Sequence, residues 1–373
     1  MQIDRRTLMA GSAALLASAP GLAKSKAQAD WYDRAIVIDA LGGLGDPYGS
    51  EGVSRMSDRA FAEMMQTGVT VVRDTVFPVG NTADPWADYQ KAIGDFHDYF
   101  AANPDRLQLV RSAADILKAK REKKFAVVIG TQDSCMVSGD LDRVARLKKD
   151  GVMSVQLTYN NGNLAGDGAL EPRDGGLTKL GRKTIERVEA EKLLLDLSHS
   201  GARTMAEATT FAKRPLVVSH TGARALTDHP RNTADSTIKA VADKGGVTGV
   251  YFMPFLTQDQ QPKGSDLIAH IEHVANVAGE DGVGIGTDNG PLPITLDEVS
   301  KKRMDDWTRE RIKLGIAAPG EAPGVYTMVA DYNSLDRYRR LARDLEKRGW
   351  IVGRLEKLFG GNFLRVYKDA WGG

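Results

Sequence analysis

Two histidines follow neighbouring predicted strands in matching contexts, and they are the strongest chemical signal in the chain. His199 ends the run DLSH and His220 ends the run VVSH. Adjacent strands of a sheet lie about 4.8 Å apart and imidazole nitrogens bind zinc at about 2.0 to 2.1 Å, so both rings could reach one ion. The pattern predicts a zinc site with these two ligands. The alternative is a pair of core histidines bonded to backbone groups.

An acid and an arginine lie in similar positions. Asp288 ends the apolar run GIGTD, where a carboxylate is typical of a metal ligand or catalytic base, although Asp-Asn-Gly is also ordinary turn chemistry. Arg231 lies in the run HPRN on the loop after His220, and a guanidinium binds a carboxylate through two parallel donors. We therefore expect Asp288 to bind metal and handle protons. Arg231 is expected to bind a substrate carboxylate, with a surface arginine as the alternative, and His229 beside it could line the pocket.

Eight short apolar runs alternate with amphipathic, helix-like stretches. This alternation is typical of parallel βα units, and eight is the strand number of a (β/α)8 TIM barrel. The predicted strands are residues 35–40, 69–75, 125–130, 152–159, 193–198, 215–219, 246–253 and 283–287. The predicted helices between them include residues 58–66, 87–102, 141–149, 177–191, 204–213, 236–244 and 265–278.

The active site of a barrel of this kind lies at the carboxyl ends of its strands. That rule adds further polar residues to the candidate site. They are Asp39, Asp74, Gln132, Asp133, Tyr159 and Tyr251. By contrast, His97, His270 and His273 lie in charged helical stretches, where we expect surface positions.

The bulk composition suits one globular α/β domain, residues 30–373. With 50 Lys and Arg against 49 Asp and Glu the net charge is +1, so nucleic acid is an improbable partner and a small molecule is favoured. The single cysteine, Cys135, excludes an intrachain disulfide. Residues 291–325 exceed what a barrel needs and could cap the pocket or contact a second subunit of a homodimer, while 335–348 and 351–359 are predicted to be closing helices.

Residues 1–29 differ from the rest of the chain. The run DRRTLM is followed by a mild apolar stretch and then by AQA, a small-x-small cleavage site. This order is typical of a twin-arginine signal peptide, which predicts export to a bacterial periplasm. The apolar stretch is shorter than the about 20 residues of a membrane-spanning helix, so we expect no membrane span in the mature protein.

Taken together, these motifs resemble the membrane (renal) dipeptidase family of zinc metallopeptidases over nearly the whole mature chain. The matching runs are VID at 37–39, LTY at 157–159, GLTKLGR at 176–182, DLSH at 196–199, SHT at 219–221, HPRN at 229–232, GIGTD at 284–288 and GGNFLRV at 360–366. The resemblance implies a barrel with two zinc ions that hydrolyses dipeptides with free termini. It also implies that His199 and His220 bind one zinc, that Asp288 serves as ligand and proton-handling group, and that Arg231 clamps the substrate carboxylate.

The chain departs from the family pattern at several metal ligands. The family's His-x-Asp pair falls at Leu41 and Gly43, its bridging glutamate at Gln132, and a substrate-binding histidine at Tyr159. The sequence therefore favours one zinc ion over two, held by His199 and His220 and completed by Asp288, Gln132 or water. Asp39, Asp74 and Asp133 are possible substitute carboxylates, and Tyr159 and Tyr251 are expected to shape the substrate pocket.

The leading prediction is zinc-dependent hydrolysis of dipeptides or related small amides, with zinc-activated water as the nucleophile. Two other readings stay open. One is a hydrolase or lyase with a single metal or none that acts on another small carboxylate. The other is a periplasmic pseudoenzyme or binding protein that keeps the pocket but has lost catalysis.

Overall fold

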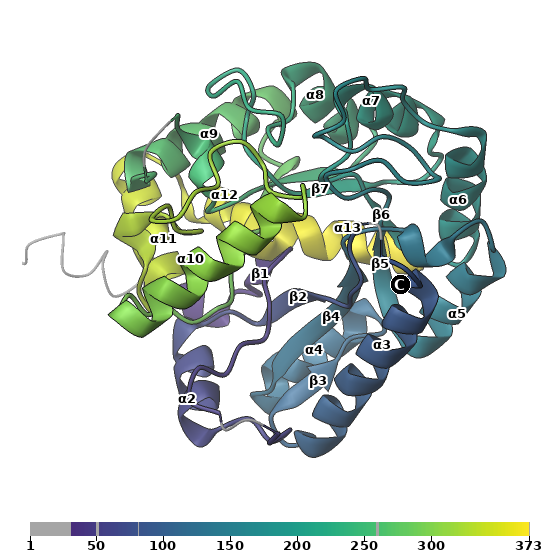
Figure 1. Ribbon diagram of the computed structural model, residues 1–373. Helices are drawn as coiled ribbons and strands as arrows, with labels where there is room; N and C mark the ends of the chain where they lie inside the picture. The colour runs from purple at the N-terminus through teal and green to yellow at the C-terminus, as the bar shows by residue number, and fades with distance from the viewer. Residues whose placement is uncertain (1–30, 50–51, 81, 259–260, 373) are drawn as a thin grey trace, which may run out of the picture.

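Eight parallel strands form the barrel that the apolar runs predict (Figure 1). The computed structural model describes residues 31–372 except 50–51, 81 and 259–260, so the predicted signal segment 1–29 lies outside the described residues. In spatial order the strands are β1 (Ile38–Asp39), β2 (Val71–Thr75), β4 (Phe125–Thr131), β5 (Val152–Gln156), β6 (Leu194–Asp196), β7 (Val217–Thr221), β8 (Val247–Val250) and β9 (Val283–Ile285). The barrel closes where the Ala40 amide donates to the Ile285 carbonyl at 2.9 Å.

The predicted helices form the outer layer of the barrel (Figure 1). Those that match the predicted stretches are α2 (Asp58–Thr67), α3 (Pro85–Ala102), α5 (Asp142–Asp150), α6 (Lys179–Ala190), α7 (Ala202–Phe211), α8 (Asp235–Asp243), α9 (Gly264–Ala278), α11 (Arg337–Lys347) and α12 (Val352–Glu356). Their ends follow local chemistry. For example, α2 begins where the Ser57 hydroxyl accepts from the Ala60 amide and ends at Gly68, whose φ of 78° suits a residue without Cβ.

In the described part of the chain, one short strand and three α-helices were not anticipated as regular structure. The short strand β3 (Leu107–Leu109) pairs with β4 outside the barrel path, and α4 (Ala113–Glu122) follows it. The predicted excursion 291–325 contains a helix of 16 residues, α10 (Glu298–Lys313). After a π-helical turn at Lys357–Gly361, α13 (Asn362–Trp371) ends the described chain.

The C-terminal helix α13 closes the barrel at the amino ends of its strands. Phe363 lies so close to Gly284 of β9 that a Cβ there would come within 2.4 Å of the phenyl ring. Asn362 donates to the carbonyl of Val283, and the indole of Trp371 donates to the carbonyl of Met153. The amino end of the barrel is therefore plugged by apolar packing, which leaves the carboxyl end for chemistry.

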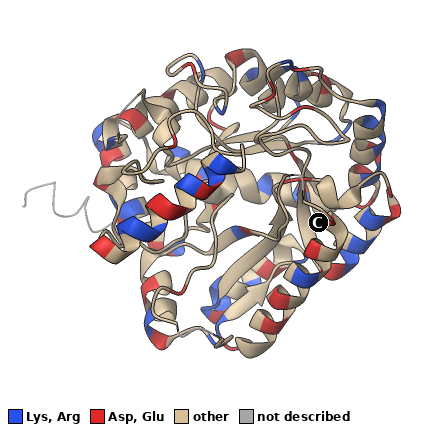
Figure 2. Cartoon of the chain, viewed as in Figure 1, with Lys and Arg blue, Asp and Glu red and all other residues tan. Residues whose placement is uncertain are grey.

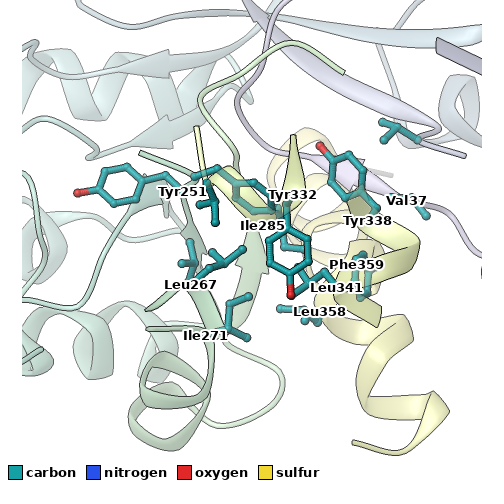
Figure 3. Close-up of a cluster of buried hydrophobic side chains, with 14 of the residues drawn as sticks. Val37, Tyr251, Leu267, Ile271, Ile285, Tyr332, Tyr338, Leu341, Leu358 and Phe359 are labelled. Atoms are coloured by element: carbon teal, nitrogen blue, oxygen red, sulfur yellow. The ribbon is translucent and has the colours of Figure 1, made fainter. Parts of the chain in front are cut away.

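A second apolar cluster joins the last barrel strands to the helices α9 and α11 (Figure 3). Ile285 and Tyr251 come from the barrel side, Leu267 from α9, and Tyr338 and Leu341 from α11. Burial of such side chains stabilises the fold by roughly 1.5 to 3 kcal/mol each. This packing holds the ends of β8 and β9, which carry site residues.

The outer helices carry acidic and basic residues in mixture on the face shown in Figure 2. Many of these charges pair along one helix, as Lys239 and Asp243 do on α8 at 2.8 Å. Exposed pairs of this kind add little to stability. No helix among the described residues is both long and apolar enough to cross a membrane.

Candidate active site

The two predicted histidines lie side by side at the carboxyl end of the barrel. His199 lies in the loop after β6 and His220 lies in β7, and both are buried. Their ring centroids are 4.8 Å apart with an angle of 59° between the planes. His199 has a φ of 65°, a left-handed conformation that is uncommon for residues other than glycine and that occurs at functional sites.

Hydrogen bonding determines which nitrogen of His199 is free. Its Nδ1 lies 2.6 Å from Oδ1 of Asn160, whose amide nitrogen donates to the carbonyl of Ile316. An amide oxygen only accepts, so Nδ1 carries the proton and Nε2 presents a lone pair. That Nε2 is buried and has no hydrogen-bond partner among the described residues.

His220 is oriented in the same sense by a buried polar chain. Its Nδ1 lies 2.8 Å from the hydroxyl of Ser219, which donates to Oδ2 of Asp196 at 2.5 Å. Asp196 is in turn ion-paired with Arg73 at 3.2 Å inside the barrel. The Ser219 hydroxyl donates its hydrogen bond to Asp196, so the Ser219 oxygen accepts from Nδ1 of His220. Nε2 of His220 therefore carries a lone pair, and this buried atom has no hydrogen-bond partner within the described structure.

Both imidazoles are neutral. Burial, followed by the positive charge of Arg231, holds the pKa of His199 and of His220 well below the usual value. The site therefore presents two neutral nitrogen bases at adjacent strand ends. Asn160, Ser219 and Asp196 orient them. None of the three was assigned this role from the sequence, although Asp196 and Ser219 lie within the runs that identified the histidines.

Arg231 is a buried cation with unused donors. Only 2% of the residue is exposed, and neither Nη1 nor Nη2 has a partner among the described residues. Its backbone amide donates to Nδ1 of His229, which fixes the loop. A buried guanidinium without partners is costly, so this group is suited to receive an anion from a ligand.

Asp288 follows β9 in a left-handed conformation, with φ of 59°. Its amide donates to the carbonyl of Leu41 at 2.8 Å, which anchors the turn to the first strand. Burial raises the pKa of its carboxyl group, while Arg231, Arg311 and Arg73 oppose that rise. The carboxylate thus lies within electrostatic reach of Arg231, and a raised pKa suits a group that exchanges protons.

The two predicted pocket tyrosines have different surroundings. Tyr159 stacks on His199, with ring centroids 4.3 Å apart, and its hydroxyl accepts from Arg311 of α10 at 3.2 Å. Tyr251 is fully buried and its hydroxyl donates to Oδ1 of Asn232. Tyr251 therefore braces the loop that carries Arg231, while Tyr159 faces the histidine pair.

The three candidate substitute carboxylates are occupied by structural hydrogen bonds. Asp39 accepts from Leu41 and Thr287 amides and from two hydroxyls, those of Thr287 and Tyr338, each at 2.6 Å. Asp74 accepts from the Leu44 and Thr75 amides. Asp133 accepts from three backbone amides and from the Asn163 side chain. The carboxylates of Asp39, Asp74 and Asp133 therefore hold loops at the mouth of the barrel. Burial raises the pKa of Asp39 and of Asp74 to about 6.

The side chains at this site could supply two nitrogen ligands to one metal ion, those of His199 and His220. They do not supply the ligands of a two-metal centre. Gln132, at the position of the bridging acid, has its oxygen bonded to the Thr75 hydroxyl at 3.1 Å. Among the described residues no group of three or more His, Cys, Asp and Glu side chains could hold an ion. His199 and His220 each present a buried Nε2 without a hydrogen-bond partner in the described structure, and two such nitrogens are fewer than the about three protein ligands of a catalytic zinc.

The remaining histidines show one error in the sequence analysis. His270 was predicted on the surface but is buried, where its Nδ1 accepts from the Ala223 amide and its Nε2 donates to the Leu256 carbonyl. His97 and His273 are partly exposed, as expected for outer helices. His229 stacks on Phe255, with ring centroids 4.4 Å apart, and lines a cavity of about 470 Å³.

The fold and this site define a (β/α)8 barrel of the metallo-dependent hydrolase type. The family model described as membrane dipeptidase, peptidase family M19, matches residues 52–304. The chain belongs to the membrane dipeptidase family, as the sequence motifs indicate. Membership of a metallopeptidase family implies a metal cofactor.

Known relatives cover this chain to different extents. A Klebsiella pneumoniae protein described as an uncharacterized protein in the pqqA 5' region is 30% identical over 282 residues, which is 73% of this chain and 92% of that protein. Dipeptidase verJ of Clonostachys rogersoniana is 28% identical over 214 residues, 56% of this chain and 55% of its own length. The match thus spans about half of the fungal enzyme. The crystal structure of an amidohydrolase from Pseudomonas aeruginosa is 30% identical, with a TM-score of 0.76, and the match covers 93% of this chain and 99% of that one.

Proposed function

We propose that this protein hydrolyses the amide bond of dipeptides or closely related small amides. Family membership and the similarity to a fungal dipeptidase support this reaction class. The observation that carries the proposal is the buried Arg231, whose two terminal nitrogens lack partners among the described residues, close enough to both imidazoles to lower their pKa. A free substrate carboxylate would pair with Arg231 and bring the adjacent amide to the histidines.

In this reaction Asp288 would transfer the proton and Arg231 would bind the substrate carboxylate. Water adds its oxygen to the amide carbonyl carbon and loses a proton to the Asp288 carboxylate. The carbon–nitrogen bond breaks, and Asp288 returns the proton to the leaving amine, so the carboxylate is regenerated. Arg231 keeps the substrate carboxylate in place throughout. The site residues at the ends of β6 and β7 hold the substrate amide in one orientation.

We further propose that His199 and His220 hold a single zinc ion. Their Nε2 lone pairs are buried, unprotonated and oriented by Asn160 and Ser219, which is the state that a metal ligand needs. When bound, zinc would polarise the carbonyl and lower the pKa of a bound water to about 7. The third ligand would be Asp288, Gln132 or water.

Metal content and hydrolysis, measured on the same preparations, test both proposals. Metal per chain is measured by plasma mass spectrometry for the wild type, for His199→Ala with His220→Ala, and for His273→Ala as a partly exposed control. We expect about one zinc ion in the wild type and the control and none in the double variant. Hydrolysis is assayed on dipeptides with a free carboxylate and on their C-terminal amides, which Arg231 should discriminate against. A wild type that cleaves no dipeptide, with or without added zinc, contradicts the hydrolase proposal.

A second candidate function is binding without catalysis. The observation that favours it is the absence of a third metal-binding side chain beside the two histidines in the described structure. A metal-independent hydrolase or lyase of another small carboxylate would share this feature. Calorimetric binding of a dipeptide or small carboxylate that Arg231→Ala abolishes, without turnover, would support the binding role.

We also propose that residues 1–29 direct export to the periplasm. The support is the order of paired arginines, apolar stretch and small-residue cleavage site in the sequence. Replacement of Arg5 and Arg6 by lysine should leave the protein in the cytoplasmic fraction. Equal periplasmic yields from the two forms would contradict a twin-arginine signal.

A further inference from the structure

The segment 298–325, here named the cover, lies over the carboxyl end of the barrel. It consists of α10 and the loop that follows, and Figure 1 shows α10 in front of the strands. The Ile316 carbonyl accepts from the Asn160 side chain, and the Pro319 carbonyl lies 2.8 Å from Nε2 of His229. Both partners belong to loops of the candidate site. Of the two roles that the sequence left open for this region, the structure shows the capping one.

Arg311 is the residue through which the cover contacts the site most directly. Its Nε and Nη2 donate to the Glu321 carboxylate at 2.7 and 3.0 Å, and Nη2 also donates to the Ile316 carbonyl. The side chains of this ion pair are only 11% and 7% exposed. A two-pronged, largely buried pair holds a guanidinium in a fixed orientation. The remaining nitrogen, Nη1, is thereby directed at Tyr159.

The contact between Arg311 and Tyr159 determines what the phenol can do. A guanidinium only donates, so the Tyr159 oxygen accepts from Nη1 at 3.2 Å and the hydroxyl hydrogen is left for another acceptor. No other hydrogen bond of this hydroxyl is present in the described structure. Stacking on His199, with ring centroids 4.3 Å apart, fixes the phenol ring against one of the two imidazoles. The hydroxyl is therefore a positioned donor at the reacting end of the site.

We propose that Arg311 is a positioning residue of the cover, and that it orients Tyr159 so that the phenol donates to the carbonyl oxygen of the scissile amide. The inference rests on the proposed hydrolysis. Negative charge grows on that oxygen when water adds to the carbon, and a donor already in place stabilises it without reorganisation. The Tyr159 proton is shared and not transferred, so the residue is unchanged after each turnover.

The same arrangement makes the cover part of the catalytic site. Asn160 orients His199 through Oδ1 and binds the Ile316 carbonyl through its amide nitrogen. The cover thus contacts both the Tyr159 hydroxyl and, through Asn160, the residue that orients the His199 ring.

A double-mutant cycle tests the inference. Steady-state kinetics are measured for wild type, Tyr159→Phe, Arg311→Met and the double variant, with Arg309→Met, an exposed arginine of α10, as the control. We expect Tyr159→Phe and Arg311→Met each to lower kcat on the order of 10²- to 10³-fold with a smaller change in KM. The double variant should be no worse than the worse single variant, and Arg311→Lys should recover part of kcat.

Two results would overturn the inference. In the first, the losses of kcat caused by Tyr159→Phe and by Arg311→Met multiply in the double variant. This would mean that the two residues act independently. The other is a change in KM alone. If Arg311→Met unfolds, Glu321→Gln keeps the shape of the pair and should show the same coupling to Tyr159→Phe. A wild type inactive on every dipeptide overturns the proposed hydrolysis itself, whereas an active wild type with an uncoupled cycle overturns only the role of Arg311.

Discussion

The imidazole rings of His199 and His220 lie 4.8 Å apart, and each is bonded through Nδ1 so that its Nε2 is an unprotonated nitrogen in a buried space. The two orienting groups differ, an amide oxygen for His199 and a serine linked to Asp196 for His220. Their effect is the same, because each removes the alternative tautomer. This shared orientation is the structural basis of the proposed zinc site.

Removal of the Ser219 hydroxyl should weaken metal binding without removing a ligand. Ser219→Ala leaves His220 in place but frees its Nδ1, so zinc affinity should fall on the order of 10- to 100-fold. Competition with a coloured chelator measures the affinity. Ser236→Ala, at an exposed position of α8, is the control and should bind zinc as the wild type does. Equal affinities for Ser219→Ala and the control would show that the Asp196 chain does not tune the site.

Replacement of Arg231 should stabilise the protein while it removes activity. The wild-type guanidinium is buried without partners for its terminal nitrogens in the described structure, so Arg231→Met relieves an unmet hydrogen-bonding cost of about 1 to 3 kcal/mol. Loss of the carboxylate clamp should raise KM on the order of 10²-fold. Denaturant unfolding and steady-state kinetics measure the two effects.

The lysine variant separates charge from geometry at this position. Arg231→Lys keeps the positive charge but cannot donate two parallel bonds, so its KM should lie between those of wild type and Arg231→Met. A methionine variant that is both less stable and equally active would mean that Arg231 serves packing and not substrate binding.

Asp288→Asn should lower kcat with little loss of stability. An amide cannot accept the proton of the attacking water, and loss of a general base typically lowers the rate on the order of 10²- to 10⁴-fold. Burial raises the pKa of Asp288, so the ionised form is disfavoured by the fold and asparagine removes that penalty. Kinetics and thermal unfolding at pH 7 check both parts. An active Asp288→Asn would assign proton transfer to another group.

The stability of the fold should fall with rising pH through the titration of Asp39. Burial raises its pKa from 3.8 to about 6, so between these values the folded state binds more protons than the unfolded state. The penalty is absent below about pH 4 and complete above about pH 6, and it amounts to roughly 3 kcal/mol. Denaturant unfolding of wild type and Asp39→Asn is measured at pH 4, 5, 6 and 7. As the pH rises, the free energy of unfolding of the wild type should fall relative to that of the variant. A constant difference would show that Asp39 does not titrate in this range.

Much of the fold could be predicted because parallel barrel strands are short, apolar and regularly spaced by helices. The runs around β4 and β5 show this, with almost every residue buried. The strand β3 was missed because three residues, LQL, carry no usable periodicity. His270 was misplaced because charged neighbours on α9 suggested a surface, while the ring itself faces the loops after β7 and β8.

The candidate site divides in the same way between local and long-range information. The sequence by itself determined the barrel, the family and the positions of His199, His220, Arg231 and Asp288, because each of these follows from a strand end or a short motif. Only the tertiary structure decided that Asp39, Asp74 and Asp133 are occupied braces. Only the structure brought Arg311 to Tyr159, which lies 152 residues earlier in the chain. Spacing along a strand predicts where a side chain stands, but the partner that satisfies or orients it comes from a distant segment, and no local pattern records that contact.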